Sequence, residues 1–275
     1  MKQSIPQPSV VLTIAGSDPS GGAGIQADIK TISALGGYAA AVITAITAQN
    51  TLGVQGVYPL PPEVLLAQLT SVMDDLHPAA VKIGMVHDAA LVRVIADVLS
   101  RYAPPYVVFD PVMVSTSGRR LMTEETIAAI EQQLFPRCTL ITPNLDEASL
   151  LTGHELHTPE EMSTAGQQLS QRFGCSVLVK GGHLSGEEMC DVLSIPSQES
   201  ISFLAPRTRS HNLHGTGCTL SSAIATLLAQ GKPLPEAIGS AKSYVSQAIQ
   251  QGSTLHIGQG NGPLWHMVNS PAVKS

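Results

Sequence analysis

The stretch HNLHGTGCTLSSAIATLL, residues 211–228, guides the interpretation of this chain, because a glycine-containing loop runs straight into an apolar segment. From Thr219 the segment has no Gly or Pro, carries Leu and Ala at helical spacing, and ends before Gly231. This pattern predicts a helix that begins at Cys218 or Thr219. A helix that starts from a glycine loop presents free backbone N–H groups at the positive end of its dipole, which suits an anion.

Cys218 stands at this predicted helix start. The positive end of the helix dipole lowers the pKa of a thiol placed there, so the position of Cys218 predicts a thiolate or a proton acceptor. Residues 211–218 alone leave a second interpretation open, in which Gly215 and Gly217 form a simple turn and Cys218 is a small buried residue. His211 and His214 lack a fourth ligand beside Cys218, so we interpret them as loop residues and not as a zinc site.

Outward from this stretch, short apolar runs alternate with helical patterns, which predicts an α/β fold with a central, mainly parallel sheet and helices on both faces. The predicted strands are residues 10–15, 41–46, 80–84, 107–110, 139–142 and 176–180, with a hairpin at 192–195 and 201–204. The predicted helices are residues 25–35, 62–76, 89–100, 123–135, 159–173, 219–228 and 235–250. No repeat or linker interrupts the pattern, so we expect one domain over residues 1–275, with loose tails at 1–8 and 270–275.

The composition excludes several classes of partner. The chain has 275 residues, 43% of them hydrophobic, and its 15 Lys and Arg against 21 Asp and Glu give a net charge of -6. Without a run of basic residues, nucleic acid and anionic membrane surfaces are poor partners. The four cysteines form no Cys-x-x-Cys pair and indicate reduced thiols. With no targeting signal and no apolar run of membrane length, we expect a cytoplasmic protein.

Polar residues and glycines follow nearly every predicted strand. Ligands bind at the carboxyl ends of the strands in such sheets, so these residues should converge on one site. The residues concerned are Gly16, Gln49, Met85, Asp110, Val112, Thr142, Asn144, Glu147 and Lys180. The first glycine loop, residues 16–24, has neither the P-loop nor the dinucleotide-binding spacing. We therefore interpret it as a place where a small ligand approaches the backbone.

Asp110 and Glu147 are the carboxylates that best fit a magnesium ion. Magnesium takes few protein carboxylates and keeps waters and phosphate oxygens as its other ligands. Lys180, at the end of a buried strand, offers a point charge to phosphate. Two alternatives stay open: Glu147 complements a helix dipole in a first turn, and Lys180 extends its ammonium group to solvent.

Four motifs in order along the chain carry a resemblance to a known family. They are the loop Gly215–Cys218, the segment Thr142-Pro143-Asn144-Leu145-Asp146-Glu147-Ala148, the segment Lys180-Gly181-Gly182-His183, and the first loop through Gln26-Ala27-Asp28. Together they resemble the ribokinase-like superfamily and, within it, the bacterial hydroxymethylpyrimidine/phosphomethylpyrimidine kinases of thiamine biosynthesis. The resemblance covers most of the chain, from Val10 to Pro263.

The resemblance implies a ribokinase-like three-layer sandwich, ATP and Mg²⁺ as co-substrates, a homodimer, and two successive phosphorylations of an aminopyrimidine alcohol. It also implies roles for individual residues. Cys218 and Lys180 would be catalytic; Gly215, Thr216, Gly217 and Cys218 would form the anion hole; Gly16, Asp28, Gln49, Met85 and Val112 would bind the substrate; Thr142, Asn144, Glu147, Lys180 and Thr216 would bind ATP and phosphate; Asp110 and Glu147 would hold the metal. Thr47 departs from close relatives, which often have an aliphatic residue there.

Gln49 bears on the choice of substrate. Its carboxamide offers a donor and an acceptor side by side, which fits the amine and ring nitrogen of an aminopyrimidine. Pyridoxal carries a phenolic oxygen at that place, and the similar vitamin B6 kinases often lack Gln there. A pyridoxal or dual-specificity kinase, and a non-catalytic pyrimidine sensor, remain alternatives. Asn50–Val54 is a candidate lid segment.

Overall fold

The structure is a computed structural model that describes residues 7–113, 122–182 and 188–268. In these ranges one nine-stranded sheet has the order β3-β2-β1-β4-β5-β6-β7-β8-β9. The strands from β2 to β7 pair in parallel, whereas β3 at one edge and β8 and β9 at the other pair antiparallel. This arrangement confirms the predicted α/β class with its mainly parallel sheet.

The bounds of the elements follow the predicted alternation. The strands are β1 Val10–Ser17, β2 Tyr38–Asn50, β3 Gly53–Pro59, β4 Ala80–Ile83, β5 Tyr106–Phe109, β6 Leu140–Ile141, β7 Ser176–Lys180, β8 Glu188–Ser194 and β9 Ile201–Pro206. The helices are α1 Gly24–Ala34, α2 Pro62–Leu76, α3 Ala89–Tyr102, α4 Glu124–Ala129, α5 Leu145–Thr152, α6 Pro159–Phe173, α7 Thr216–Ala229 and α8 Leu234–Gly252. The predicted hairpin is present as β8 and β9.

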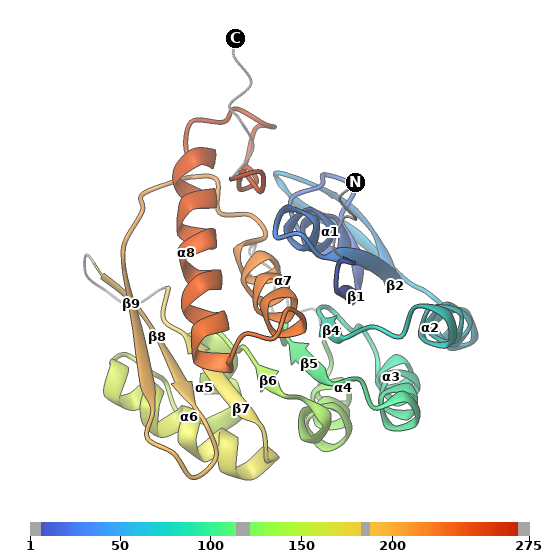
Figure 1. Cartoon of the computed structure of the whole chain (residues 1–275). Helices are drawn as coiled ribbons and strands as arrows, with labels where there is room; N and C mark the ends of the chain where they lie inside the picture. The colour runs from blue at the N-terminus through green and yellow to red at the C-terminus, as the bar shows by residue number, and fades with distance from the viewer. Residues whose placement is uncertain (1–6, 114–121, 183–187, 269–275) are drawn as a thin grey trace, which may run out of the picture.

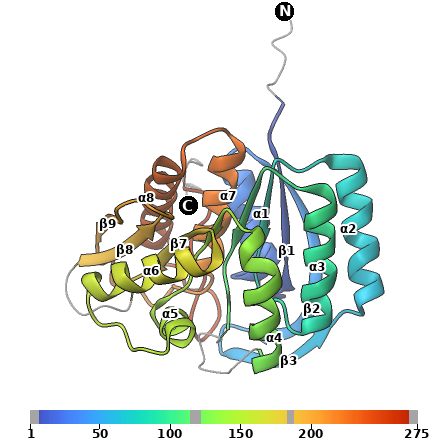
Figure 2. The same cartoon turned by 90° about the horizontal axis from the view of Figure 1, so that it is seen from below.

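Helices cover both faces of the sheet, as Figures 1 and 2 show. Helices α1, α7 and α8 pack on one face, and α2, α3, α4 and α6 pack on the other. Successive residues of a strand point to opposite faces of the sheet. Val11 therefore joins the apolar core beneath α7 and α8, and Leu12 joins the core beneath α2 and α3. The carboxyl ends of the parallel strands thus meet at one edge, between two apolar layers.

The structure departs from the predicted elements in several places, among them helix α5, which is absent from the predicted helices. Strand β3 was not predicted, because an exposed edge strand shows no apolar alternation. The predicted helix 123–135 is α4 followed by a π-helical turn, Ile130–Leu134, and a 3₁₀ turn. Helix α7 begins at Thr216, earlier than predicted, because Gly215 takes a left-handed φ of 85° and serves as its N-cap.

Some expectations fall on residues that the structure does not describe. The predicted tails lie mostly outside the described residues, and so does His183 of the predicted Lys180–His183 motif. Within the described ranges, no helix has both the length and the apolarity needed to cross a membrane.

Candidate functional site

Asp110 and Lys180 meet at the carboxyl edge of the sheet, although 70 residues separate them. Lys180 Nζ donates to Asp110 Oδ1 at 2.6 Å, and Thr142 Oγ1 donates to the same oxygen at 3.2 Å. Gly217 lies directly against this pair: a Cβ placed there would be 3.0 Å from Asp110 Oδ2 and 3.4 Å from Lys180 Nζ. The glycine loop before α7 and the ends of β5 and β7 therefore form one cluster.

Lys180 carries its positive charge at neutral pH. Burial lowers the pKa of its ammonium group, but Asp110 and Glu147 raise it by more, and the pKa lies above its ordinary value. Its side chain is still 15% exposed, against 3% for Asp110. The arrangement keeps a partly accessible cation next to backbone amides, which suits an anionic group.

Glu147 is bound by backbone amides at the start of α5. Its Oε2 accepts from the Asn144 N–H at 2.8 Å while Asn144 Oδ1 accepts from the Glu147 N–H at 2.8 Å, which is a capping box. Glu147 Oε1 accepts from the Met113 N–H at 3.3 Å. The alternative interpretation of Glu147 as a first-turn acid thus describes its contacts in this structure.

The same carboxylate lies close enough to Asp110 and Lys180 to interact with both. Burial, with a smaller contribution from Asp110, raises the pKa of Glu147 to about 7, and Lys180 opposes that rise. Two buried acids therefore share one lysine. A divalent cation would supply the missing positive charge, so the residue types fit a magnesium ion that keeps water and phosphate as its other ligands.

Within residues 7–113, 122–182 and 188–268, no group of three or more His, Cys, Asp or Glu is placed so that it could hold a metal ion. The Asn144 side chain caps α5, and the Asn144 backbone forms an isolated parallel β-bridge with Lys180. Asp110 and Glu147 stay the predicted metal pair, and water and phosphate oxygens would have to complete the ligands of the ion.

Cys218 lies in the first turn of α7, between the pair Lys180–Asp110 and a second buried pair, Lys82–Asp28. Burial raises the pKa of its thiol to about 11; Lys82 and a hydrogen bond from the Gly24 amide act in the opposite direction. The prediction of a lowered pKa is therefore wrong for this structure. Desolvation of the thiolate outweighs the attraction of Lys82 and the hydrogen bond from the Gly24 amide, and Asp28 and Asp110 add to the rise.

Asp28 differs most from its predicted role. The structure places its carboxylate at 0% exposure, with Lys82 Nζ at 2.9 and 3.0 Å. Thr13 Oγ1 and Ser222 Oγ donate to it at 2.5 and 2.6 Å. These donors occupy both oxygens, so Asp28 presents no surface for the predicted substrate contact. The sequence analysis did not identify this pair. Its one sequence signal is Lys82, a charged residue inside the otherwise apolar strand β4.

Of the other predicted substrate contacts, Gly16 and Met85 are in direct contact. A Cβ on Gly16 would be 2.7 Å from the methyl carbon of Met85, so Met85 packs on the Gly16 backbone. Val112 is half-buried and its N–H donates to the Asp110 carbonyl at 2.9 Å, one residue from Met113. Gln49 is half-buried near the end of β2, where the pairing with β3 is irregular.

Thr216 contributes to the shape of the predicted anion hole. Both its N–H and its hydroxyl donate to the Leu213 carbonyl, at 3.2 and 2.7 Å. Gly215 packs so closely on the first glycine loop that a Cβ there would overlap the carbonyl oxygen of Gly22. The residues nearest Asp110 and Lys180 are therefore Gly217 and Cys218, whereas Thr216 closes the turn.

Asp18 and His214, two residues that the sequence analysis did not assign to the site, join the glycine loops. His214 Nε2 lies 2.8 Å from Asp18 Oδ2. Burial acts to raise the pKa of Asp18, but hydrogen bonds from His214, Ser20 and Ala23 lower it to about 2. Loop histidines and a turn aspartate are common, so their types alone could not single them out.

The candidate lid, residues 50–54, is held in place by the C-terminal loop. Thr51 Oγ1 accepts from the N–H groups of Gln259 and Gly260 at 3.1 Å each. The segment forms the turn of the β2–β3 hairpin. In this structure it is a hydrogen-bonded turn, and Gly258 and Gly260 pack against Thr51.

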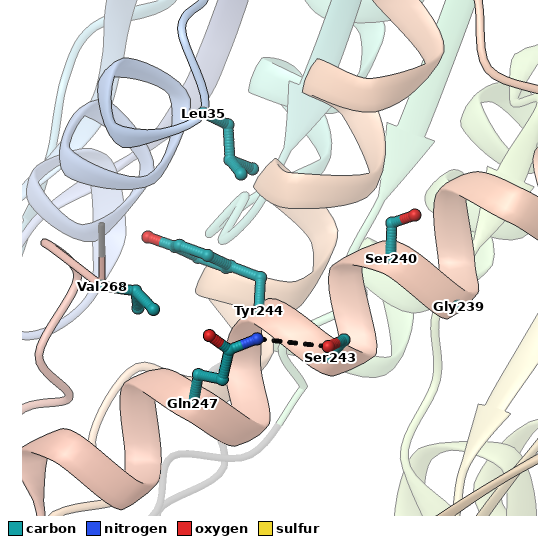
Figure 3. Close-up of a pocket in the computed structure, with 7 residues that line it drawn as sticks. All are labelled: Leu35, Gly239, Ser240, Ser243, Tyr244, Gln247 and Val268. Atoms are coloured by element: carbon teal, nitrogen blue, oxygen red, sulfur yellow. Dashed lines mark hydrogen bonds between the residues drawn. The ribbon is translucent and has the colours of Figure 1, made fainter.

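A surface hollow of 430 Å³ lies between α8 and the segment after α1, as Figure 3 shows. Leu35, Tyr244 and Val268 form its apolar side, and Ser243 and Gln247 are hydrogen-bonded to each other across its rim. No charged side chain lines it, and none of the predicted site residues does. It does not suit a phosphate.

Comparisons with known proteins agree with the resemblance seen in the sequence. The family model described as phosphomethylpyrimidine kinase matches residues 18–265. A hydroxymethylpyrimidine/phosphomethylpyrimidine kinase of Rhizobium meliloti (strain 1021) is 49% identical over 259 residues, 94% of this chain and 97% of the relative.

Two solved structures share the fold. The crystal structure of a phosphomethylpyrimidine kinase from Clostridium difficile 630 is 44% identical with a TM-score of 0.78, covering 88% of this chain and 99% of the other. An ADP complex of Bacillus subtilis pyridoxal kinase is 34% identical with a TM-score of 0.88, covering 96% and 99%. From the match over most of its length, the chain belongs to the phosphomethylpyrimidine kinase family.

Proposed function

We propose that this chain transfers the terminal phosphoryl group of ATP to 4-amino-5-hydroxymethyl-2-methylpyrimidine, and then transfers a second one to the resulting monophosphate. One observation carries the proposal: Lys180, Asp110 and the Gly217–Cys218 backbone form a cluster at the strand ends. A cation, an acid and a helix start at one point suit a migrating phosphoryl group.

Charge neutralisation and alignment provide most of the catalysis of phosphoryl transfer. The amides of Gly217 and Cys218 lie at the start of α7, where the helix dipole favours the negative charge of the transferred group. Lys180 would bind the phosphate oxygens, while Asp110 holds its ammonium group in place and Thr142 in turn donates to Asp110. Asn144 and Glu147 would order the neighbouring strand end for ATP.

Magnesium would be held by Asp110 and Glu147 together with phosphate oxygens, and when bound it supplies positive charge to the ATP phosphates. The residues themselves orient the transfer: Lys180 stays fixed by its ion pair, and α7 presents its amides.

The two acceptors differ in their need for a base. The alcohol must lose a proton from its hydroxyl, and Cys218 is the residue proposed to receive it. A phosphate monoester oxygen is already ionised at neutral pH, so the second transfer proceeds without a base. Since burial raises the pKa of Cys218 to about 11, only a small thiolate fraction serves the first transfer at neutral pH.

A pyridoxal kinase is the second candidate, because the Bacillus subtilis pyridoxal kinase matches this fold with a TM-score of 0.88. Gln49 favours the aminopyrimidine, since its carboxamide offers one donor and one acceptor side by side. An ADP-release assay with the pyrimidine alcohol, its monophosphate and pyridoxal separates the two. We expect the two pyrimidines to be preferred. A preference for pyridoxal, or no ADP release with any acceptor, would overturn the proposal.

We further propose that the active form is a cytoplasmic homodimer. Large apolar side chains are exposed along residues 46–66, which span the β2–β3 edge and the start of α2: Ile46, Leu52, Tyr58, Val64 and Leu66. An exposed apolar edge of this kind is typical of a protein interface. Light scattering should give twice the mass of the chain, and Tyr58→Lys should shift it toward the single chain. A wild-type protein of single-chain mass would contradict the dimer.

A further inference from the structure

The carboxamide of Gln49 lies between two side chains from distant parts of the chain. In the structure its Nε2 is 3.3 Å from His214 Nε2, and its Oε1 is 3.2 Å from Thr47 Oγ1. An amide can be turned by half a rotation about its last bond, which exchanges oxygen and nitrogen without moving any other atom. The hydrogen-bonding capacity of the two neighbours decides which way it lies.

The contact with Thr47 requires a donor on Gln49. Thr47 Oγ1 is 2.9 Å from the Ser17 carbonyl oxygen, which can only accept, so the single hydroxyl hydrogen of Thr47 is directed there. Thr47 then offers only lone pairs to Gln49. The carboxamide must therefore turn its NH₂ group, and not its oxygen, toward Thr47.

The contact with His214 leads to the same orientation. His214 Nε2 lies 2.8 Å from Asp18 Oδ2, and a carboxylate with a pKa of about 2 is an acceptor at neutral pH. His214 Nε2 must therefore carry the hydrogen. Gln49 is the second neighbour of this N–H group, and an N–H group can only donate, so the Gln49 atom that faces it must be an acceptor. The carboxamide oxygen of Gln49 therefore faces His214.

Asp18 makes this orientation firm. Its Oδ1 accepts from the Ser20 N–H and hydroxyl at 2.9 and 2.7 Å, and its Oδ2 accepts from the Ala23 N–H at 2.9 Å. These bonds fix the carboxylate within the first glycine loop, and the carboxylate fixes the histidine. Gln49 is thus held from one side by its own strand and from the other by both loops.

We propose that Thr47 and His214 are specificity-determining positioning residues that hold the Gln49 carboxamide with its NH₂ toward Thr47 and its oxygen toward His214. This inference rests on the proposed function of the site. One amide hydrogen and one oxygen lone pair of Gln49 then remain for the substrate ring, the hydrogen on the Thr47 side and the lone pair on the His214 side. An aminopyrimidine pairs with them one way round only, which directs its hydroxymethyl group. A ring with the donor and acceptor exchanged leaves polar groups unpaired.

The kinetic test removes the acceptor on Thr47. Thr47→Val should lower kcat/KM for the pyrimidine alcohol by about tenfold, mainly through KM, and Thr47→Ser should restore it. In a Gln49→Met background the same change should have little effect, because no carboxamide remains to be oriented. The matched control is Thr226→Val, another buried threonine, whose hydroxyl bonds only the Ser222 carbonyl at 2.7 Å. Equal losses from Thr47→Val in both backgrounds would overturn the inference.

A second measurement reads the orientation without any turnover. In the ligand-free protein, the Gln49 side-chain amide signals are those missing from the NMR spectrum of Gln49→Met. The nuclear Overhauser effect from these amide protons should be strongest at the Thr47 methyl group. A stronger nuclear Overhauser effect at the His214 ring protons would overturn the inference. If the orientation is as expected but the pyrimidine alcohol is not phosphorylated, the proposed function fails and the assigned orientation stands.

Discussion

Two lysine–aspartate pairs flank Cys218, and they differ in how much water reaches them. Lys82 and Asp28 both have 0% exposed side chains, whereas Lys180 is 15% exposed and its partner Asp110 3%. Both lysines interact electrostatically with the Cys218 thiol. The sequence shows each pair only as a lysine in or after a strand and an acid elsewhere.

The difference separates a structural pair from a chemical one. Every oxygen of Asp28 is already bound by neighbours from β1, β4 and α7. Asp110 instead directs Oδ2 toward Gly217, next to an ammonium group that solvent can reach. A buried pair holds elements together, but only the partly open pair can exchange its partners for a phosphate.

The largest effect should come from breaking the fully buried pair. Lys82→Met leaves the Asp28 carboxylate without its cation, and loss of one partner of a buried pair costs about 3–5 kcal/mol. Urea unfolding should show this loss in the free energy of unfolding. The double variant Lys82→Met/Asp28→Asn should regain much of it, because no unpaired charge remains. A single variant as stable as the wild type would remove the distinction between the two pairs.

Breaking the open pair should affect catalysis more than stability. Lys180→Met removes the ammonium group beside the α7 amides, and loss of one such stabilising group lowers kcat by about 10²–10³. The free energy of unfolding should fall less than in Lys82→Met, since the Lys180 side chain is 15% exposed whereas that of Lys82 is 0% exposed. ADP release and urea unfolding measure the two effects on one preparation. A kcat close to that of the wild type would exclude Lys180 from the transfer.

Asp18 provides a smaller, pH-dependent effect. Its folded pKa of about 2 lies below the ordinary 3.8, so its contribution is present above pH 3.8 and disappears as the pH falls through the folded pKa. At pH 7 the contribution is about 2 kcal/mol. The stability difference between wild type and Asp18→Asn should therefore shrink as unfolding is measured at successively lower pH. A difference that stays constant would show that the carboxylate charge does not matter.

Sequence reasoning could find what local pattern and sheet topology determine. Apolar, β-branched runs predict buried strands, and parallel strands bring Asp110 and Lys180 to one edge whatever the details of packing. The glycine loop before α7 was recognisable for the same reason, because Gly215 is followed at once by a helical pattern.

Sequence reasoning could not find what depends on packing between distant segments. Asp28 and Lys82 lie 54 residues apart, and only the packing of α1 on the sheet shows that they form a closed pair. The pKa of Cys218 depends on which loop covers its thiol. His214 and Asp18 are 196 residues apart, and each by itself is an ordinary loop residue.

The smallest expected effect concerns Cys218, which lies between the two pairs. The first transfer needs a base and the second does not, so Cys218→Ala should lower the rate of the first more than that of the second, by about tenfold. With the folded pKa near 11, the thiolate fraction grows as the pH rises, and the first transfer should speed up from pH 7 to 9 while the second changes less. Single-turnover rates with the alcohol and with the monophosphate measure the two steps separately. The pH-dependent difference should vanish in Cys218→Ala, because alanine cannot accept a proton. Equal losses in both transfers would remove the thiol from the chemistry and leave Lys180 and the backbone amides of α7 as the groups that act on the transferred phosphoryl group.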